Sequence, residues 1–155
     1  MKQNQLLPCL AVFLSSRDQA VESVYCELAP FSIRAQVPER TWVDKVFALC
    51  DYYLAGEITR HSRHIYDIYK LMSAIDWMDQ KALIMEVRED RRKNKTCLSA
   101  QCDISVTTVL AQIVDSGYYR RDYESVTSAL LAEKVDYDTA VHALKQIIAF
   151  GLFDV

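Results

Sequence analysis

Apolar residues recur at helical spacing through most of the chain after Pro38. In residues 39–54 they fall every three or four positions, and the same spacing returns in residues 62–75. Such spacing gathers the apolar side chains on one face of an amphipathic helix. Gly56 lies between the two segments and suits a turn. The pattern therefore predicts two consecutive helices joined at Gly56.

Four further segments with helical periodicity follow, and glycines mark two of their ends. Gly117 and Gly151 lie where helices should stop, because glycine readily adopts the left-handed conformation that ends a helix. Asp136 suits the N-cap of the last segment, and Asp138 suits the positive end of its dipole. The predicted helices span residues 79–93, 104–116, 121–132 and 137–150.

Before Pro38 the pattern changes to the alternation that is typical of strands. Apolar and polar residues alternate throughout residues 31–37, and Pro38 would end the ladder because it has no N–H. Residues 9–14 and 21–28 are two further candidates. We predict an α+β fold in which residues 1–37 form a small antiparallel sheet. A mainly helical bundle of about five to six helices follows in residues 38–155.

Composition and charge narrow the class of protein. The chain has 155 residues, 51% hydrophobic and 25% charged, which is typical of one ordinary domain. A net charge of −3 gives no support to sequence-independent binding of DNA or RNA. No run approaches the roughly 18 apolar residues of a membrane-spanning helix, and residues 6–14 do not form a signal peptide. We expect a cytoplasmic protein without membrane contact.

Several kinds of site find no support in the sequence. The glycines are far apart, so a phosphate-cradling loop is excluded, and neither GxSxG nor a cysteine–histidine nucleophile is present. His61 and His64 have the spacing of one helix face, but no carboxylate or cysteine accompanies them as a metal ligand. The scattered cysteines indicate reduced thiols rather than disulfides or zinc. They are Cys9, Cys26, Cys50, Cys97 and Cys102.

Three ionisable residues flank the first two predicted helices. Lys45 borders the apolar stripe of residues 39–54, while Arg63 and Asp67 lie opposite the stripe of residues 62–75. Arg63 and Asp67 have the i,i+4 spacing of a surface salt bridge, which contributes a few tenths of a kcal/mol. A lysine beside a core stripe usually lays its stem on the apolar surface. Spacing alone therefore favours surface charges over a site.

The two segments together resemble a known family. PERTWVDKVFAL followed by SRHIYDIYKL resembles the C-terminal half of the AbiEii/AbiGii toxin family of nucleotidyltransferases. That family commonly shows a T-F/W-x-x-K helix and then an R-H/D-x-x-D-L/I-Y helix. The resemblance continues through VESVYCELAPFSIRAQV upstream and DSGYYRRDYESVTSALLAEKVDYDTAVHALKQI downstream, so it covers most of the chain. It implies transfer of a nucleotide from an NTP with Mg²⁺.

The resemblance also implies site residues. Lys45 would contact the nucleotide triphosphate, and Arg63 and Asp67 would complete the active site, with Lys45 and Arg63 binding the NTP. Two cations suit a polyphosphate whose charge grows at the leaving group, and a carboxylate can orient the arginine or help place the metal. His64 stands where many relatives have aspartate, and we assign it no role.

One part of the family pattern is missing. Nucleotidyltransferases of this kind hold Mg²⁺ with a glycine-serine or glycine-threonine turn followed by an Asp-x-Asp or Asp-x-Glu pair. No such turn or pair precedes Pro38. We therefore expect a C-terminal portion of the enzyme, truncated or split from its catalytic N-terminal half. It would contribute part of an NTP site and be inactive alone.

Two alternatives remain open. A non-catalytic interaction module would use the exposed sheet edge to form a homodimer or to pair with a separate catalytic chain. The family resemblance leaves an RNA acceptor such as tRNA open for the nucleotidyltransferase, although the charge does not support it. A helical module that contacts nucleic acid would instead use a basic run. That run contains Arg88, Arg91, Arg92, Lys93 and Lys95.

Overall fold

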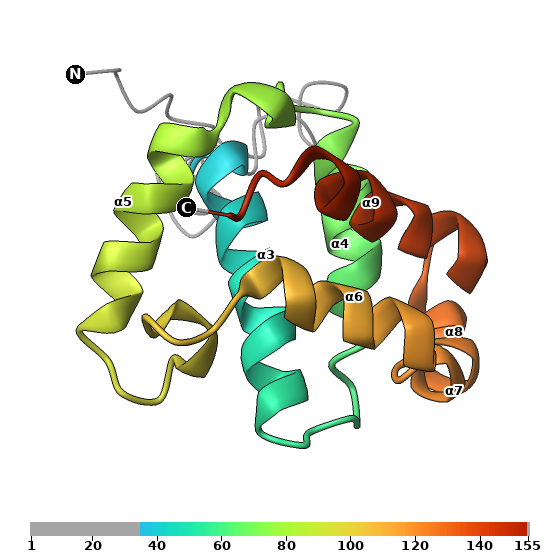
Figure 1. The fold of residues 1–155 in the computed structure, drawn as a ribbon. Helices are drawn as coiled ribbons and strands as arrows, with labels where there is room; N and C mark the ends of the chain where they lie inside the picture. The colour runs from blue at the N-terminus through green and yellow to red at the C-terminus, as the bar shows by residue number, and fades with distance from the viewer. Residues whose placement is uncertain (1–34, 155) are drawn as a thin grey trace, which may run out of the picture. The chain divides into compact units, whose positions relative to one another are not determined.

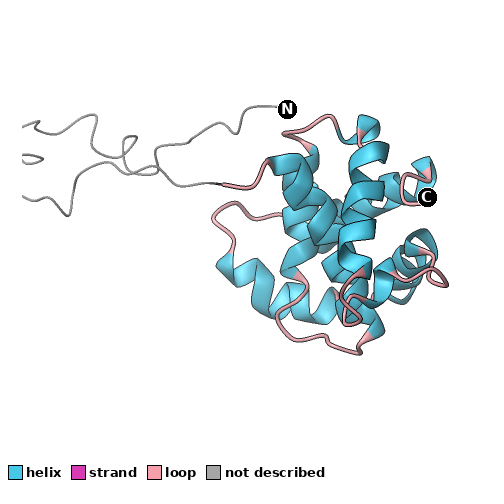
Figure 2. Ribbon diagram, turned by 90° about the vertical axis from the view of Figure 1, so that its left-hand side faces the viewer, coloured by secondary structure: helices cyan, strands magenta, loops and turns pink. Residues whose placement is uncertain are grey.

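The computed structural model describes residues 35–154, and the chain divides between Val37 and Pro38. The unit that begins at Pro38 is built from helices joined by turns (Figures 1 and 2). The α-helices are α3 (Pro38–Leu54), α4 (Arg63–Met72), α5 (Lys81–Arg92), α6 (Val106–Ser116), α7 (Arg120–Asp122), α8 (Ser128–Leu130) and α9 (Tyr137–Phe150). The tighter or wider turns are the 3₁₀ segments η2 (Trp77–Asp79) and η3 (Leu98–Ala100) and the π-helical η4 (Tyr123–Thr127).

The predicted α+β class is wrong for the part of the chain that the structure describes, where every regular element is a helix. The strands predicted in residues 9–14 and 21–28 lie outside the described residues. Of the third, only Ala35, Gln36 and Val37 are described, and they are not in a strand. Pro38 does not end a ladder but begins α3, because proline suits a first helical turn whose N–H groups have no partner.

Helix α3 carries much of the core. Its buried side chains are Trp42, Val43, Val46, Phe47, Leu49 and Cys50. Helices α4, α5 and α6 pack against α3, and α9 packs against α4 and α6 (Figure 1). The residues after α9 return to the core, where the ring of Phe153 lies 5.7 Å from that of Trp42 and 5.5 Å from that of Phe47. This packing fixes the mutual position of α3 and α4.

Most helix ends follow the local signals. Gly117 and Gly151 end α6 and α9 in the left-handed conformation, with φ of 61° and 60°. Asp136 caps α9, accepting a hydrogen bond from the Thr139 N–H at 2.8 Å. The helix predicted for residues 121–132 is observed over residues 120–130, where α7, η4 and α8 follow one another without a break; its π-helical turn was not predicted. None of the described helices has the length and apolar character needed to cross a membrane.

Candidate functional site

Lys45 and Asp67 form an ion pair between α3 and α4. The Lys45 Nζ donates to Asp67 Oδ2 at 2.7 Å. The helices bring them together because their apolar faces, with Val46 on α3 and Ile68 on α4 fully buried, pack against each other. The Lys45 and Asp67 side chains remain 29% and 33% exposed. The pair therefore lies at the rim of the α3–α4 contact, where a ligand can reach it.

Arg63 does not join that pair. It is exposed at the start of α4, and its expected salt bridge with Asp67 is not found among the described residues, since the Asp67 carboxylate turns to Lys45. Arg63 instead lines a hollow of about 460 Å³ beside η4 and α8. Four residues of helix separate Arg63 from Asp67 by about 6 Å along the axis. The structure thus joins two of the three predicted residues and leaves the third one turn away.

His64 is buried beside the ion pair. Its Nδ1 lies 3.9 Å from Asp67 Oδ2, and neither ring nitrogen has a hydrogen-bond partner among the described residues. Burial, reinforced by the positive charge of Lys45, lowers the pKa of His64 to about 4. The imidazole is therefore neutral near pH 7 and does not compete with Lys45 for the charge of Asp67.

His61, in the turn before α4, and His64, in α4, both face the ring of Tyr52. Tyr52 stacks on His61 with ring centroids 3.6 Å apart, and its ring is nearly parallel to that of His64 at 5.5 Å. His61 Nε2 also lies 3.2 Å from the Glu57 carboxylate. Within residues 35–154, no three side chains of His, Cys, Asp or Glu gather in a way that would hold a metal.

Asp122 organises the start of α4, and the sequence patterns did not indicate this role. Its buried carboxylate accepts hydrogen bonds from the Ser62 N–H at 3.3 Å, the Ser62 hydroxyl at 2.7 Å and the Arg60 N–H at 3.0 Å. Asp122 lies 60 residues from Ser62, so no local motif connects them. A carboxylate at this end of α4 satisfies N–H groups that have no partner within the helix.

The Asp122 contact also holds an unusual backbone. Arg60 has φ of 68°, the sole positive value outside glycine in the described part of the chain. For a residue with a Cβ atom this conformation costs about 1 kcal/mol. The hydrogen bond from the Arg60 N–H to Asp122 stabilises it. The turn between α3 and α4 is therefore fixed from a distant segment.

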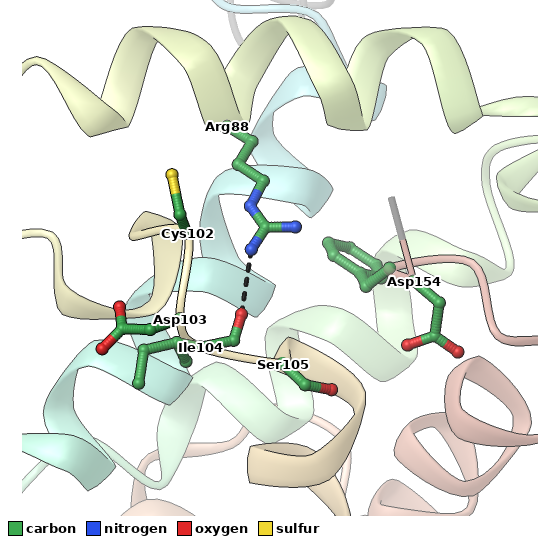
Figure 3. Close-up of a pocket in the computed structure, with 7 residues that line it drawn as sticks. Arg88, Cys102, Asp103, Ile104, Ser105 and Asp154 are labelled. Carbon is green, nitrogen blue, oxygen red and sulfur yellow. Dashed lines mark hydrogen bonds between the residues drawn. The ribbon is translucent and has the colours of Figure 1, made fainter.

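The basic run of α5, expected as a possible nucleic-acid surface, is largely engaged within the protein. Arg88 is buried and donates to the carbonyls of Gln101 at 3.1 Å and Ile104 at 2.9 Å; Figure 3 shows the latter bond. Arg91 pairs with Asp44 and Asp51 at 3.1 and 2.8 Å.

The remaining members of the run are arranged similarly, apart from the exposed Lys95. Arg92 donates to the carbonyl of Ala100 at 2.9 Å, and Lys93 pairs with Asp90 at 2.9 Å. Arg88 also borders a second hollow, of about 320 Å³, next to Cys102 and Asp154 (Figure 3). Because its donors already meet carbonyls, this hollow offers a ligand little free positive charge. The geometry does not favour α5 as a nucleic-acid surface.

Comparison with known proteins identifies the family. The family model described as "Nucleotidyl transferase AbiEii toxin, Type IV TA system" matches residues 12–146, a span that includes Lys45, Arg63 and Asp67. No curated protein and no solved structure matches the chain. The resemblance predicted from the two motifs is confirmed. The chain therefore belongs to the AbiEii family of nucleotidyltransferase toxins.

Proposed function

We propose that this chain forms the NTP-facing part of a nucleotidyltransferase active site, with Lys45, Arg63 and Asp67 as its functional residues. The ion pair between Lys45 Nζ and Asp67 Oδ2 supports this proposal most strongly. It unites in space the two motifs on which the family resemblance rests, although 22 residues separate them in the chain. The pair also stays accessible, as a substrate site requires.

Lys45 is the group that contacts the triphosphate. An ammonium group has three N–H donors, and the contact with Asp67 uses one, so two remain for phosphate oxygens. Asp67 holds the ammonium in place and acts as a positioning residue. Charge-assisted hydrogen bonds of this kind are about twice as strong as neutral ones, and partial exclusion from water strengthens them further.

Arg63 supplies a second cation along the same helix. Its guanidinium is permanently charged, and its planar set of donors matches the geometry of phosphate oxygens. It is exposed at the first turn of α4, one turn from the ion pair. Negative charge grows on the leaving pyrophosphate during nucleotidyl transfer, and fixed cations stabilise that charge.

The Mg²⁺ implied by the family does not fit the residues that the structure describes. Asp67 is bonded to Lys45, so it is not a free carboxylate ligand. The helical part has one Asp-x-Asp and one Asp-x-Glu. In the first, Asp136 caps α9 and Asp138 makes two bonds to Arg120, at 2.6 and 3.1 Å. In the second, Asp122 accepts hydrogen bonds from Ser62 and the Arg60 N–H, and Glu124 accepts one from Arg120 at 3.4 Å. We derive no metal step from these carboxylates and assign phosphate binding to Lys45 and Arg63 alone.

The metal ligands would come from a different segment. No glycine precedes Gly56, so the glycine-serine turn of the family pattern is absent ahead of the Lys45 motif. We infer that the chain does not turn over alone and pairs with a separate segment that carries this turn and a carboxylate pair. We place the reaction in the cytoplasm, where NTPs are available.

Calorimetry of the full chain with Mg²⁺–NTP tests the proposal. Lys45→Ala should weaken binding about tenfold or more, because a charge-assisted bond to phosphate is lost. Lys95→Ala removes the same charge from an exposed position on another part of the surface and should leave binding unchanged. Absence of NTP binding both alone and after addition of a segment with the glycine-serine turn and Asp-x-Asp pair would refute the proposed function.

A further inference from the structure

His64 is a buried polar side chain without a partner, and it lies beside the proposed nucleotide site. Its side chain is 7% exposed, and neither ring nitrogen has a hydrogen-bond partner among the described residues. Buried polar groups in folded proteins almost always form hydrogen bonds, and an exception needs a reason. A phenylalanine has similar size and would fill the space without leaving two ring nitrogens unpaired. The imidazole therefore indicates a role other than packing.

Asp67 is an acceptor almost within reach of this imidazole. His64 Nδ1 lies 3.9 Å from Asp67 Oδ2, about 1 Å beyond an ordinary N–H···O hydrogen bond. The same oxygen accepts the bond from Lys45 Nζ at 2.7 Å. A carboxylate can accept about four hydrogen bonds, so Lys45 leaves room for a second donor. The Asp67 side chain is 33% exposed, and a small rotation of it would close the gap.

The neighbouring rings hold His64 in place for this contact. The planes of the Tyr52 and His64 rings are within 5° of parallel, with ring centroids 5.5 Å apart. Tyr52 also stacks on His61, whose Nε2 lies 3.2 Å from the Glu57 carboxylate. His64 itself belongs to the first turn of α4, which fixes its backbone. The imidazole is thus positioned by two helices, while the carboxylate keeps the freedom to move.

The charges around His64 keep it neutral while Lys45 pairs with Asp67. The titratable groups that face the ring are Lys45 and Tyr52 from α3, Arg63 and Asp67 from α4, and His61 from the preceding turn. Burial lowers the pKa of His64 most, and the charge of Lys45 lowers it next, whereas Asp67 raises it. A triphosphate that neutralises the Lys45 charge would therefore raise this pKa. It would also leave the Asp67 carboxylate in need of another donor.

We propose that His64 is a positioning residue of the nucleotide site, whose Nδ1–H becomes the second donor to Asp67 when the Lys45 ammonium binds a triphosphate. This rests on the proposed function, in which Lys45 contacts the NTP. Phosphate oxygens then share the ammonium with Asp67, and the carboxylate gains a hydrogen bond from His64 in return. The new bond holds Asp67 against the ammonium, so the pair keeps the geometry that binds phosphate.

The first test needs no nucleotide. The chain contains three histidines, so nitrogen NMR of histidine-labelled protein gives three imidazole signals, which His61→Gln and His142→Gln assign. Lys45→Met removes the ammonium, and Asp67 should then accept a bond from His64. We expect the proton on Nδ1 and a pKa of His64 raised from about 4 by about 1 or more.

The control for this test is the double variant Lys45→Met/Asp67→Ala, which removes the acceptor as well. It should give a smaller rise in the pKa of His64, because the imidazole gains no hydrogen bond and no negative neighbour. An equal rise in the single and double variants would overturn the proposal, since loss of the lysine charge alone would then explain the change.

The second test measures Mg²⁺–NTP affinity of the full chain by calorimetry. His64→Phe keeps the packing volume but removes the donor, and it should weaken binding about threefold to tenfold. The loss should vanish in an Asp67→Ala background, because His64 acts through Asp67. His64→Asn, whose amide can donate from a similar place, should retain more affinity than His64→Phe.

His61→Phe is the matched control, since His61 stacks on the same Tyr52 ring but meets Glu57 instead of Asp67. It should change NTP affinity less than about twofold. A loss in His64→Phe that persists without Asp67 would make His64 a packing residue and overturn the proposal.

The two proposals fail in different ways. A rise in the pKa of His64 in Lys45→Met that requires Asp67, without NTP binding in any variant, would contradict the proposed function and leave His64 as the second partner of Asp67. NTP binding that depends on Lys45 but is unchanged by His64→Phe would contradict the role of His64 and leave the nucleotide site.

Discussion

Helix α5 and the start of α4 both carry clustered arginines, but they use them differently. Arg88 and Arg91 of α5 point into the protein, where they meet carbonyls and carboxylates of other elements. Arg60 and Arg63, around the start of α4, line a hollow without such partners in the described part of the chain. The α5 run has the stronger basic pattern in the sequence, yet the weaker arginine pair has the free charge. An arginine is structural when carbonyls or carboxylates of the protein already accept its hydrogen bonds, and it can bind a ligand when they do not. The density of basic residues along the chain does not make this distinction.

The largest loss of stability should come from substituting a buried arginine of α5. Arg88→Ala removes a buried guanidinium and leaves the carbonyls of Gln101 and Ile104 without their donor. We expect the free energy of unfolding to fall by about 4 kcal/mol, from several lost charge-assisted bonds and the vacated volume. Urea denaturation measures it. Arg63→Ala, at an exposed position, should cost less than about 0.5 kcal/mol.

The contrast between α5 and α4 fails if both substitutions destabilise the protein equally. In that case Arg63 would also be a structural residue, and its place in the proposed nucleotide site would need another explanation.

His64 should produce the next largest effect, through pH. Its pKa is lowered from 6.5 to about 4 in the folded protein, so between these values the unfolded chain binds a proton that the folded chain does not. The stabilisation by neutral His64 is complete above about pH 6.5 and is lost as the pH falls through about 4. The total loss amounts to about 3 kcal/mol.

Urea denaturation at a series of pH values measures this dependence. His64→Gln should flatten the fall in stability between pH 6.5 and 4, whereas His142→Gln, on the exposed face of α9, should not. An unchanged slope in His64→Gln would mean that the imidazole is protonated in the folded protein and is not the neutral neighbour of the Lys45–Asp67 pair.

Local signals predicted most helices because caps and periodicity act over a few residues. The last helix has the predicted bounds, Tyr137–Phe150, with Asp136 at its N-cap and Gly151 at its end. The helix predicted for residues 121–132 is present over residues 120–130, but the pattern did not predict its π-helical turn or the bonds from Asp122 to Ser62 and Arg60, far away in the chain. The strand ladder predicted to end at Pro38 was mispredicted because proline also starts helices.

The candidate site was predictable only in part. The two motifs indicated Lys45, Arg63 and Asp67, and whether these residues act together stays a prediction. Spacing within α4 predicted that Asp67 pairs with Arg63, but tertiary packing gives it Lys45 from α3. The burial of Arg88 could not be predicted from the sequence either, since the carbonyls that it binds lie 13 and 16 residues further along the chain. Pairing between separate elements leaves no periodic trace in a sequence.

The smallest expected effect concerns the Lys45–Asp67 pair itself. About a third of each side chain is exposed, so water screens their attraction and the pair should add less than about 1 kcal/mol to stability. A double-mutant cycle with Lys45→Ala, Asp67→Asn and the double variant isolates this coupling in urea denaturation. The same cycle measured on Mg²⁺–NTP affinity should give a larger coupling, because Asp67 holds the ammonium that meets the triphosphate. A coupling in stability of about 3 kcal/mol, without one in NTP binding, would make the pair a structural contact like those of Arg88 and would remove the distinction between α5 and α4.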